Sequence, residues 1–350
     1  MSESTSPPLA RALLERDGAS RTLADRAAQF DADPTSLVLL LRGTKALLSE
    51  RVEDVAPALD LRSPIEVRAV LGGAERVTLR CYLGRLVTGV DEAPGHASVE
   101  DRHAASDLDP GSLPASAAPP VEVWVLDDEA ADAIEPEPAR WIGLRQAATQ
   151  LEVYEAGLLA QAVAIANWHA ASRFCPRCGG PTELAEAGWS RRCTVDGGSI
   201  FPRTDPAVIV LVTDAEDRVL LGSNAMWESN RFSLLAGYVE PGESLEHAVV
   251  REIGEEAGLP VGDVQYAGSQ PWPFPASLML GFTARAVATA PSPKVTPDGV
   301  EILELRWFTR EELAAALPEI GFPGRTSIAG WLLERWFGAP IESSPRGWGA

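Results

Sequence analysis

The sequence predicts an α+β protein made of three successive parts and a short tail. Residues 205–340 alternate β-branched runs with helical patterns, which is typical of strands packed with helices. Residues 173–204 hold three of the four cysteines, and residues 1–172 mix strand-like apolar runs with helical patterns. At 350 residues the chain is long enough for two or three domains that each bury a core. We therefore expect an N-terminal mixed α/β domain, a cysteine segment, a C-terminal α+β domain and a tail at 341–350.

The composition is that of a folded protein and disfavours several functions. Hydrophobic residues make up 45% of the chain and charged residues 23%, which is too apolar for wholesale disorder. The formal net charge of −20 at pH 7 disfavours sequence-blind binding to nucleic acid or to an anionic lipid surface. No apolar run approaches the ~18 residues of a membrane-spanning helix, and the first residues lack the apolar core of a secretory signal. We therefore expect a cytoplasmic protein without a membrane partner.

The first part carries strand and helix signals but no readable chemistry. Apolar runs at 36–41 and 121–126 predict strands, and residues 91–120, rich in Pro, Ala, Ser and Asp, predict a loose surface loop. Apolar residues at helical spacing predict a helix over 158–172 that leads into the cysteine segment. No internal repeat is apparent in the sequence.

The histidines and the isolated cysteine give no sign of catalysis. His96, His103, His169 and His247 form no pair at ligand or dyad spacing, and we expect an ordinary surface position for each. Cys81 is predicted to be a small buried apolar side chain.

The last part opens with strand signals and closes with a helix signal. Residues 207–212 and 218–221 are aliphatic, β-branched runs that predict strands. Residues 327–337 predict the final helix.

A glutamate-rich helix is predicted between Ser244 and Gly258. Ser244 is a suitable N-cap residue, and Gly258, which precedes a proline, is a suitable stop. At about 100° per residue, Glu252 and Glu256 fall on the same stripe as the apolar residues of this helix, with Glu255 at its flank.

Two interpretations of these carboxylates compete. A glutamate-rich helix is often a solvated surface helix, but solvated glutamates belong opposite the apolar stripe. Carboxylates directed toward the protein body are costly unless they pair or bind cations. Magnesium and manganese take oxygen ligands and retain waters that suit phosphate chemistry, so the stripe favours a divalent-metal site.

The segment from Gly237 to Leu259 resembles the signature of the Nudix hydrolases. It reads G-x5-E-x7-R-E-U-x-E-E-x-G-U, where U is aliphatic, without departure. The resemblance implies a Nudix α/β/α sandwich over residues 205–340, use of Mg²⁺ or Mn²⁺, and attack of water on the diphosphate of a nucleoside derivative. If one of the metal-binding glutamates also acts as the general base, we expect it to be Glu256. The implied site comprises the catalytic metal ligands Glu252, Glu255 and Glu256, a ligand carbonyl at Ala236, and motif support from Gly237, Glu243, Arg251 and Gly258.

A second segment, SQPWPFPAS at residues 269–277, narrows the substrate. Its three alternating prolines predict a stiff, extended backbone that presents the rings of Trp272 and Phe274 for stacking. The alternative is a packed loop or a groove for a partner peptide. The segment resembles the mark of the NADH pyrophosphatase subfamily, which splits NADH into reduced nicotinamide mononucleotide and AMP. The implied substrate-binding residues here are Gln270, Pro271, Trp272, Pro273, Phe274, Pro275, Ala276 and Ser277.

Three further residues follow from the same resemblance. Glu301, six residues before a tryptophan, occupies the place of an additional metal ligand, with Glu304 as a competitor. The alternative is that either acid is only an exposed strand residue. Ala329, at the start of the last helix, is implied to contact the nucleotide through its backbone.

The cysteine segment resembles a zinc ribbon. Cys175 and Cys178 form one knuckle, and Cys193 pairs with Asp196 where the subfamily usually has cysteine. Carboxylate oxygen is an accepted zinc ligand, so a Cys3Asp zinc site is one interpretation. The other is a ribbon held by packing, with free thiols.

Phe201 directly follows the ribbon. In the subfamily an aromatic residue at this place belongs to the nucleotide site, which implies that Phe201 stacks on adenine. The alternative is a core phenylalanine at the start of a strand.

The sequence as a whole predicts a metal-dependent hydrolase of NADH and NAD that releases nicotinamide mononucleotide and AMP and that cleaves related dinucleotides less efficiently. Removal of an NAD cap from RNA 5′ ends is a second interpretation, and a non-catalytic zinc-ribbon interaction module with a relic Nudix fold is a third. Residues 1–172 are implied to support a homodimer. The ribbon is the only part with net positive charge, so RNA would engage through its 5′ end near Arg173, Arg177, Arg191 and Arg192.

Overall fold

The computed structural model divides the chain into two compact units. One unit combines residues 1–10 with 204–350, and the other comprises residues 11–203. Most of the predicted loop at 91–120, the tail after Ile341, and His96 and His103 lie outside the described residues. The structure describes residues 6–11, 14–50, 56–72, 76–86, 118–287 and 293–341.

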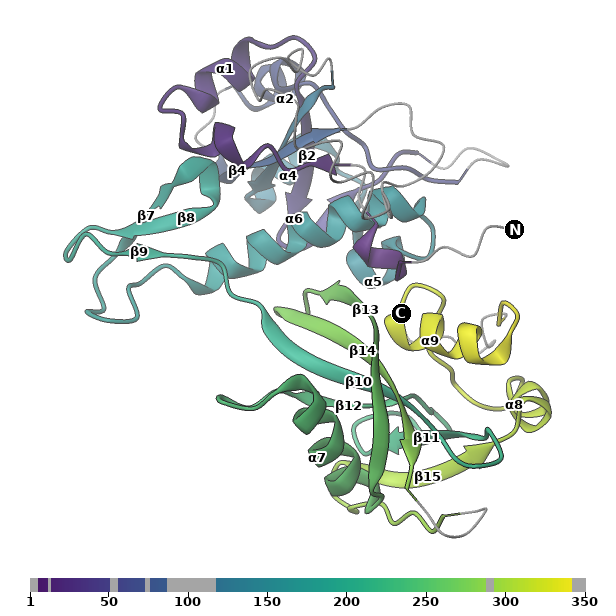
Figure 1. Cartoon of the computed structure of the whole chain (residues 1–350). Helices are drawn as coiled ribbons and strands as arrows, with labels where there is room; N and C mark the ends of the chain where they lie inside the picture. Colours follow the sequence, from purple (N-terminus) through teal and green to yellow (C-terminus); the bar gives the residue numbers. More distant parts are fainter. Residues whose placement is uncertain are drawn as a thin grey trace, which may run out of the picture. The chain divides into compact units, whose positions relative to one another are not determined.

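The unit with residues 204–350 is built on a six-stranded mixed sheet (Figure 1). The strand order is β13-β14-β10-β11-β15, and β12 pairs with β10. β10 and β14 run parallel, and the other pairs are antiparallel. The strands are β10 (Asp205–Thr213), β11 (Val219–Asn224), β12 (Leu235–Tyr238), β13 (Val261–Trp272), β14 (Ser277–Ala286) and β15 (Ile302–Phe308).

Helices cover both faces of this sheet. On β10, Val208 and Val210 pack in one apolar cluster with α7 (Leu245–Ala257), whereas Ile209 and Leu211 pack in a second cluster with the other two helices. Those helices are α8 (Arg310–Ala316) and α9 (Ile328–Phe337). The predicted α/β/α sandwich is confirmed.

The start and stop signals of the glutamate-rich helix act as predicted. The Ser244 hydroxyl accepts from the His247 N–H at 3.2 Å at the start of α7. Gly258 ends the helix with φ 61°, a left-handed conformation that favours glycine. His247 is exposed, as predicted.

The unit of residues 11–203 contains a second six-stranded sheet, in the order β1-β4-β5-β2-β3-β6. The predicted strands at 36–41 and 121–126 are confirmed as β2 and β5, and the predicted helix before the cysteines is confirmed as α6. The strands are β1 (Leu14–Glu15), β2 (Leu37–Arg42), β3 (Lys45–Leu47), β4 (Val77–Leu86), β5 (Pro120–Leu126) and β6 (Trp141–Gly143). The helices are α1 (Arg26–Ala32), α2 (Pro64–Leu71), α4 (Asp128–Ile134), α5 (Leu144–Ala147) and α6 (Val153–Ala171). Short 3-10 helices lie at Pro8–Ala10, Gly18–Thr22, Pro138–Arg140 and Glu186–Gly188.

The two sheets share one topology. The parallel pair β2–β5 corresponds to β10–β14, and the antiparallel neighbours β4, β3 and β6 correspond to β13, β11 and β15. Antiparallel bridges from Leu59 and Arg62 take the place of β12, and α2 takes the place of α7. The prediction that the chain has no internal repeat is wrong at the level of the fold, because apolar periodicity specifies such a fold without conserved residue identities. α2 carries a single acid, Glu66, so the carboxylate cluster belongs to one copy alone.

The cysteine segment forms a small antiparallel sheet in the unit of residues 11–203. Its strands are β7 (Thr182–Ala185), β8 (Ser190–Cys193) and β9 (Ser199–Ile200). No helix in the described part of the chain combines the length and the apolar character needed to cross a membrane.

His169 is buried, so the predicted surface position is wrong. It is only 5% exposed because α6 packs against other elements along most of its length. His169 Nε2 donates to the Gly188 carbonyl at 2.7 Å, and Arg191 donates to Nδ1 at 3.0 Å. Burial is the main cause that lowers the pKa of His169 to about 4. Cys81 is buried as predicted, and burial raises the pKa of its thiol.

Candidate active site

Two of the three predicted motif glutamates on α7 point into the protein. The Glu252 side chain is 12% exposed and Glu256 is 4% exposed, whereas the Glu255 side chain is 62% exposed. Glu256 Oε2 is buried and has no hydrogen-bond partner in the described part of the chain. Burial, followed by the charges of Glu301, Glu252 and Asp298, raises the pKa of Glu256 to about 8. Burial likewise raises the pKa of Glu252.

β12 brings its backbone against these carboxylates. A Cβ on Gly237 would lie 2.0 Å from the carboxyl carbon of Glu252, so only glycine permits this approach. The backbone of Ala236 forms a hydrogen bond with the Glu256 carboxylate. β12 and α7 therefore form the two walls of the carboxylate cluster.

Arg251 ties the motif loop to the helix. Its Nε and Nη2 donate to the two oxygens of Glu243, each at 2.9 Å, and Nη2 also donates to the Tyr238 carbonyl at 2.9 Å. Its Nη1 donates to Glu252 Oε1 at 2.9 Å and to Glu255 Oε2 at 3.0 Å. The hydrogen bonds from Arg251 are the main cause that lowers the pKa of Glu243 to about 2. The contact that the motif implies between Arg251 and Glu243 is present.

Of the two acids in the 301–308 segment, Glu301 is the one whose charge adds to burial in raising the pKa values of Glu252 and Glu256. Glu301 lies just before β15. The competitor Glu304 instead accepts from Arg306 at 2.6 Å. Asn224 donates to Glu301 Oε1 at 3.3 Å.

Sequence reasoning missed Asp298 and Asn224, both next to Glu301. The dipeptide Asp298-Gly299 before a strand is a turn signal that could have drawn attention to the first. No local signal identifies Asn224, because its partner lies 77 residues away in the chain.

The proline-rich segment is a hairpin turn, so the predicted extended backbone is wrong beyond Trp272. Trp272 pairs with Ser277 across the antiparallel strands β13 and β14, and the four residues between them must reverse the chain. The rings of Trp272 and Phe274 pack edge to face, with centroids 4.9 Å apart, instead of standing as separate faces. Pro273 in the turn is buried, and Pro275 is exposed.

The polar residues at the two ends of this segment contact the protein. Gln270 is fully buried, and its Nε2 donates to the Thr326 carbonyl at 3.1 Å. Ser277 is 7% exposed and lies 3.1 Å from the hydroxyl of Tyr238. Ala329 is buried in the first turn of α9, three residues after Thr326.

Phe201 follows β9 in the unit of residues 11–203. It is 62% exposed, so the alternative of a core phenylalanine is wrong. Its stacking on adenine stays a prediction.

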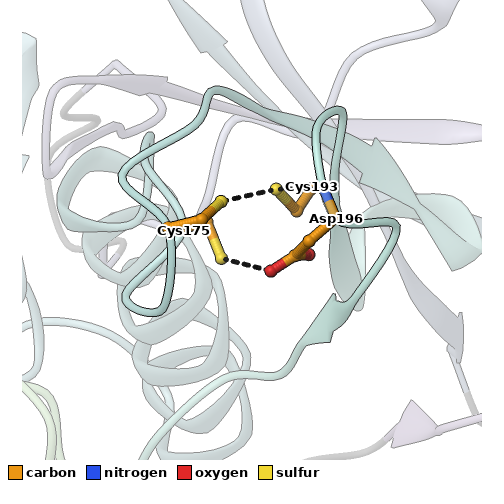
Figure 2. A group of neighbouring side chains, drawn as sticks. Cys175, Cys193 and Asp196 are labelled. Carbon is orange, nitrogen blue, oxygen red and sulfur yellow. Dashed lines mark hydrogen bonds between the residues drawn. The ribbon is translucent and has the colours of Figure 1, made fainter.

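The four predicted zinc ligands converge in the ribbon (Figure 2). Figure 2 shows Cys175, Cys193 and Asp196 pointing toward one another, and the ligand atoms of these residues and Cys178 all lie within 4.8 Å of each other. Cys175 Sγ is 3.6 Å from Asp196 Oδ2, and Cys178 Sγ is 3.4 Å from Cys193 Sγ. A tetrahedral zinc with Zn–S distances of about 2.3 Å places ligands about 3.8 Å apart, so this donor set fits zinc.

Three of the four ribbon arginines predicted near an RNA 5′ end make hydrogen bonds within the unit of residues 11–203, among them Arg192, which donates to the Gly197 carbonyl at 3.3 Å. Arg191 donates to Thr182 and His169 and is partly buried. Arg177 donates to Asp196 Oδ1 at 3.2 Å. Arg173 is exposed.

Three family models match successive parts of the chain. Residues 35–168 match the NADH pyrophosphatase-like rudimentary NUDIX domain. Residues 170–201 match the NADH pyrophosphatase zinc ribbon domain, and residues 203–329 match the NUDIX domain.

Curated relatives extend across these parts. The NAD-capped RNA hydrolase NudC of Mycobacterium bovis (strain BCG / Pasteur 1173P2) is 44% identical over 225 residues, which are 61% of this chain and 71% of the relative. The chain belongs to the NADH pyrophosphatase subfamily of the Nudix hydrolases. The NAD-capped RNA hydrolase NUDT12 of Homo sapiens is 40% identical to this Nudix hydrolase over 201 residues, 53% of this chain and 43% of that one. A NUDIX hydrolase structure from Nitrosomonas europaea matches 50% of this chain and 97% of its own length at 24% identity, with a TM-score of 0.38.

The carboxylate cluster of this Nudix hydrolase fits a divalent cation. Nudix enzymes use divalent metals, and the charges of Glu301 and Glu252 both act on the buried Glu256. The unpartnered Glu256 Oε2 is a buried oxygen of the kind that a hard cation binds. A bound cation would favour the charged form of Glu256.

Proposed function

We propose that this Nudix hydrolase cleaves the diphosphate of NADH and NAD with water, releasing nicotinamide mononucleotide and AMP. The observations that carry the proposal are the buried Glu256, whose Oε2 has no hydrogen-bond partner among the described residues, and the charges of Glu301 and Glu252 that act on it. The SQPWPFPAS hairpin in the same unit supports the choice of a dinucleotide with flat rings.

The acids would hold the cation, with the Ala236 carbonyl and Glu255 as further ligands. When bound, Mg²⁺ or Mn²⁺ supplies positive charge against the diphosphate and lowers the pKa of a bound water. Arg251 fixes the position of Glu252 through the hydrogen bond at 2.9 Å. It also donates to Glu255, whose exposed side chain lies at the edge of the cluster.

Glu256 is the residue that we assign as general base. It is the most buried acid of the cluster, and its Oε2 is free to accept a proton from water. Burial and the neighbouring acids raise the pKa of Glu256, so a bound cation would be needed to keep this carboxylate ionised and able to accept a proton.

The substrate is assigned to the β13–β14 hairpin, through Trp272 and Phe274, and to the start of α9 at Ala329. The Gln270–Thr326 hydrogen bond connects these two regions, which supports a common binding site. The stacking of Phe201 on adenine remains a separate prediction.

The test is a substrate panel with the full chain and either Mg²⁺ or Mn²⁺. NADH, NAD, ADP-ribose and diadenosine compounds are each incubated and the products identified. We expect nicotinamide mononucleotide and AMP from NADH, and Glu256→Gln should abolish turnover without loss of fold. Glu246→Gln, an exposed acid on the same helix, is the matched control and should retain activity. Full activity of Glu256→Gln would refute the assignment, and no product from any dinucleotide would support a non-catalytic role.

Removal of NAD caps from RNA is the second candidate function. It is favoured by the relatives from M. bovis and Homo sapiens, both named NAD-capped RNA hydrolases. The discriminating measurement compares release of nicotinamide mononucleotide from NAD-capped RNA and from NADH under the same conditions. A kcat/KM for capped RNA above that for NADH would make RNA the preferred substrate.

We also propose that Cys175, Cys178, Cys193 and Asp196 bind zinc. The proposal is supported by the 4.8 Å limit on their ligand atoms and by free cysteines that form no disulfide. About one zinc per chain is expected in the purified protein, and Cys175→Ser should lose it. Zinc content equal in both proteins would place the metal elsewhere. A homodimer and a cytoplasmic location stay predictions from the sequence.

A further inference from the structure

Asn224 joins the end of β11 to the side chain of Glu301. Asn224 Nδ2 donates to Glu301 Oε1 at 3.3 Å, and Asn224 Oδ1 accepts from the Met226 N–H at 2.9 Å. The Ala225 N–H donates to the Glu301 carbonyl at 2.8 Å. One short segment thus holds both the main chain and the carboxylate of Glu301.

A β-bulge lies next to this contact. Ser223 pairs with Glu304 and Asn224 pairs with Ile302, so Leu303 is the extra residue on β15. Leu303 is 56% exposed, and Ile302 is 4% exposed. Bulges re-aim the side chains near them. Here the bulge keeps Ile302 in the core and leaves Glu301 beside Asn224.

A turn capped by Asp298 presents Glu301 from the other side. Asp298 Oδ1 accepts from the N–H groups of Val300, Glu301 and Ile302 at 3.1, 3.1 and 2.8 Å. These backbone hydrogen bonds lower the pKa of the Asp298 carboxyl, so it stays ionised. Because three main-chain N–H groups already donate to this oxygen, we expect it to support the backbone of the turn and not to bind a cation.

We propose that Asn224 and Asp298 are positioning residues that aim the Glu301 carboxylate at Glu252 and Glu256. The proposal rests on the proposed function, because it takes Glu301 as a ligand of the divalent cation. Asn224 fixes the rotation of the carboxylate, and Asp298 fixes the backbone from which it extends. Supporting contacts of this kind raise metal affinity because the ligand is already oriented before the cation binds.

The test is a double-mutant cycle read by Mn²⁺ affinity, measured on the full chain by electron paramagnetic resonance. Asn224→Ser is the informative variant, because a serine hydroxyl can still accept from the N–H two residues on but cannot reach Glu301. We expect Asn224→Ser to weaken Mn²⁺ binding about tenfold. In a Glu301→Gln background the same change should have no further effect, because the carboxylate that it orients is gone. Additive effects would overturn the proposal.

Asp298 is tested by conservative rescue. Asp298→Asn keeps an oxygen that accepts the backbone donors, so its Mn²⁺ affinity should stay close to that of the unsubstituted chain. Asp298→Ala should weaken binding about tenfold. Equal affinities for both variants would contradict the role in the turn. Ser229→Ala, exposed on the loop after Asn224, is the matched control and should bind Mn²⁺ normally.

The readouts separate this proposal from the proposed function. Mn²⁺ binding requires no dinucleotide, so a non-additive cycle in a protein that cleaves no NADH would uphold the positioning role and refute the NADH activity. If NADH is cleaved, Asn224→Ser should lower kcat more than it raises KM. Cleavage of NADH together with an additive cycle would refute the positioning role alone.

Discussion

Gly237 on β12 and Glu252 on α7 occupy adjoining space. A Cβ at residue 237 would lie 2.0 Å from the Glu252 carboxyl carbon and 2.1 Å from its Oε1. The displaced atoms belong to the far end of a flexible side chain, so the conflict moves a carboxylate without breaking the sheet. Gly237 therefore leaves room for the Glu252 carboxylate at the metal site. A larger residue at this position should reduce activity more than it reduces stability.

Gly237→Ala should lower activity while the fold persists. We expect kcat/KM to fall about tenfold or more, as for loss of support to a metal ligand. Gly254→Ala on α7 is the control, because no atom lies within 4 Å of a Cβ there. That change should keep activity and raise the free energy of unfolding by up to about 1 kcal/mol. Equal activity of the two variants, measured with NADH alongside thermal melts, would contradict the steric argument.

Arg251→Lys should damage the site although it keeps the charge. A lysine ammonium cannot reproduce the paired bonds that Arg251 makes to both oxygens of Glu243 while it also contacts Glu252. We expect weaker Mn²⁺ binding and lower kcat, because both the motif loop and a ligand lose their support. Arg285→Lys, on β14, serves as the control for a generic arginine change. Unchanged Mn²⁺ affinity in Arg251→Lys would show that charge alone suffices.

Lowering the pH should destabilise the unit of residues 11–203 through His169. Its folded-state pKa of about 4 lies below the ordinary value of 6.5, so the unfolded state binds the proton more readily between these values. The contribution is complete above pH 6.5 and is lost as the pH falls toward 4, at up to about 1.4 kcal/mol per pH unit. Protonation would place a hydrogen on Nδ1 against Arg191.

Urea unfolding followed by tryptophan fluorescence tests this slope. His169→Asn removes the titrating group, so its free energy of unfolding should be lower at pH 7, and the gap to the unsubstituted chain should narrow by pH 4.5. Parallel pH profiles for the two proteins would exclude His169 as the source.

Local signals predicted the glutamate helix, and long-range contacts explain what the sequence did not show. Ser244 and Gly258 act within one turn of the helix ends, so the bounds of α7 could be read directly. The apolar stripe of α7 likewise predicted that Glu252 and Glu256 point into the protein, because helical periodicity is also a local property of the sequence. The reversal after Trp272 depends on its pairing with Ser277, which local proline geometry does not specify.

Asp196 should bind zinc more weakly than a cysteine at the same place. Its Oδ1 is occupied by Gly198 N–H at 2.8 Å and by Arg177 at 3.2 Å, so Oδ2 alone faces Cys175. Asp196→Cys should raise zinc affinity, because thiolate is the preferred ligand of structural zinc, and Asp196→Asn should lower it. Competition with a chromophoric chelator measures both, and the order Cys, Asp, Asn is the expected ranking. Identical affinities for the three would mean that residue 196 is not a ligand.

The anchors of the β13–β14 hairpin should control substrate binding more than the chemical step. Gln270 ties β13 to the Thr326 carbonyl before α9, and Ser277 ties β14 to the Tyr238 hydroxyl on β12. Gln270→Met keeps the side-chain volume but removes the Nε2 donor. The hydrogen bond that connects the hairpin to the segment before α9 is then lost, while the glutamates of α7 stay in place. We expect KM for NADH to rise several-fold with a smaller change in kcat, because the lost contacts bind the substrate and the transition state equally. Tyr238→Phe removes the second tie and should act in the same direction. Because neither tie contacts the carboxylate cluster directly, Mn²⁺ affinity should be unchanged in both variants. A fall in Mn²⁺ affinity would show that the hairpin and the metal site are coupled.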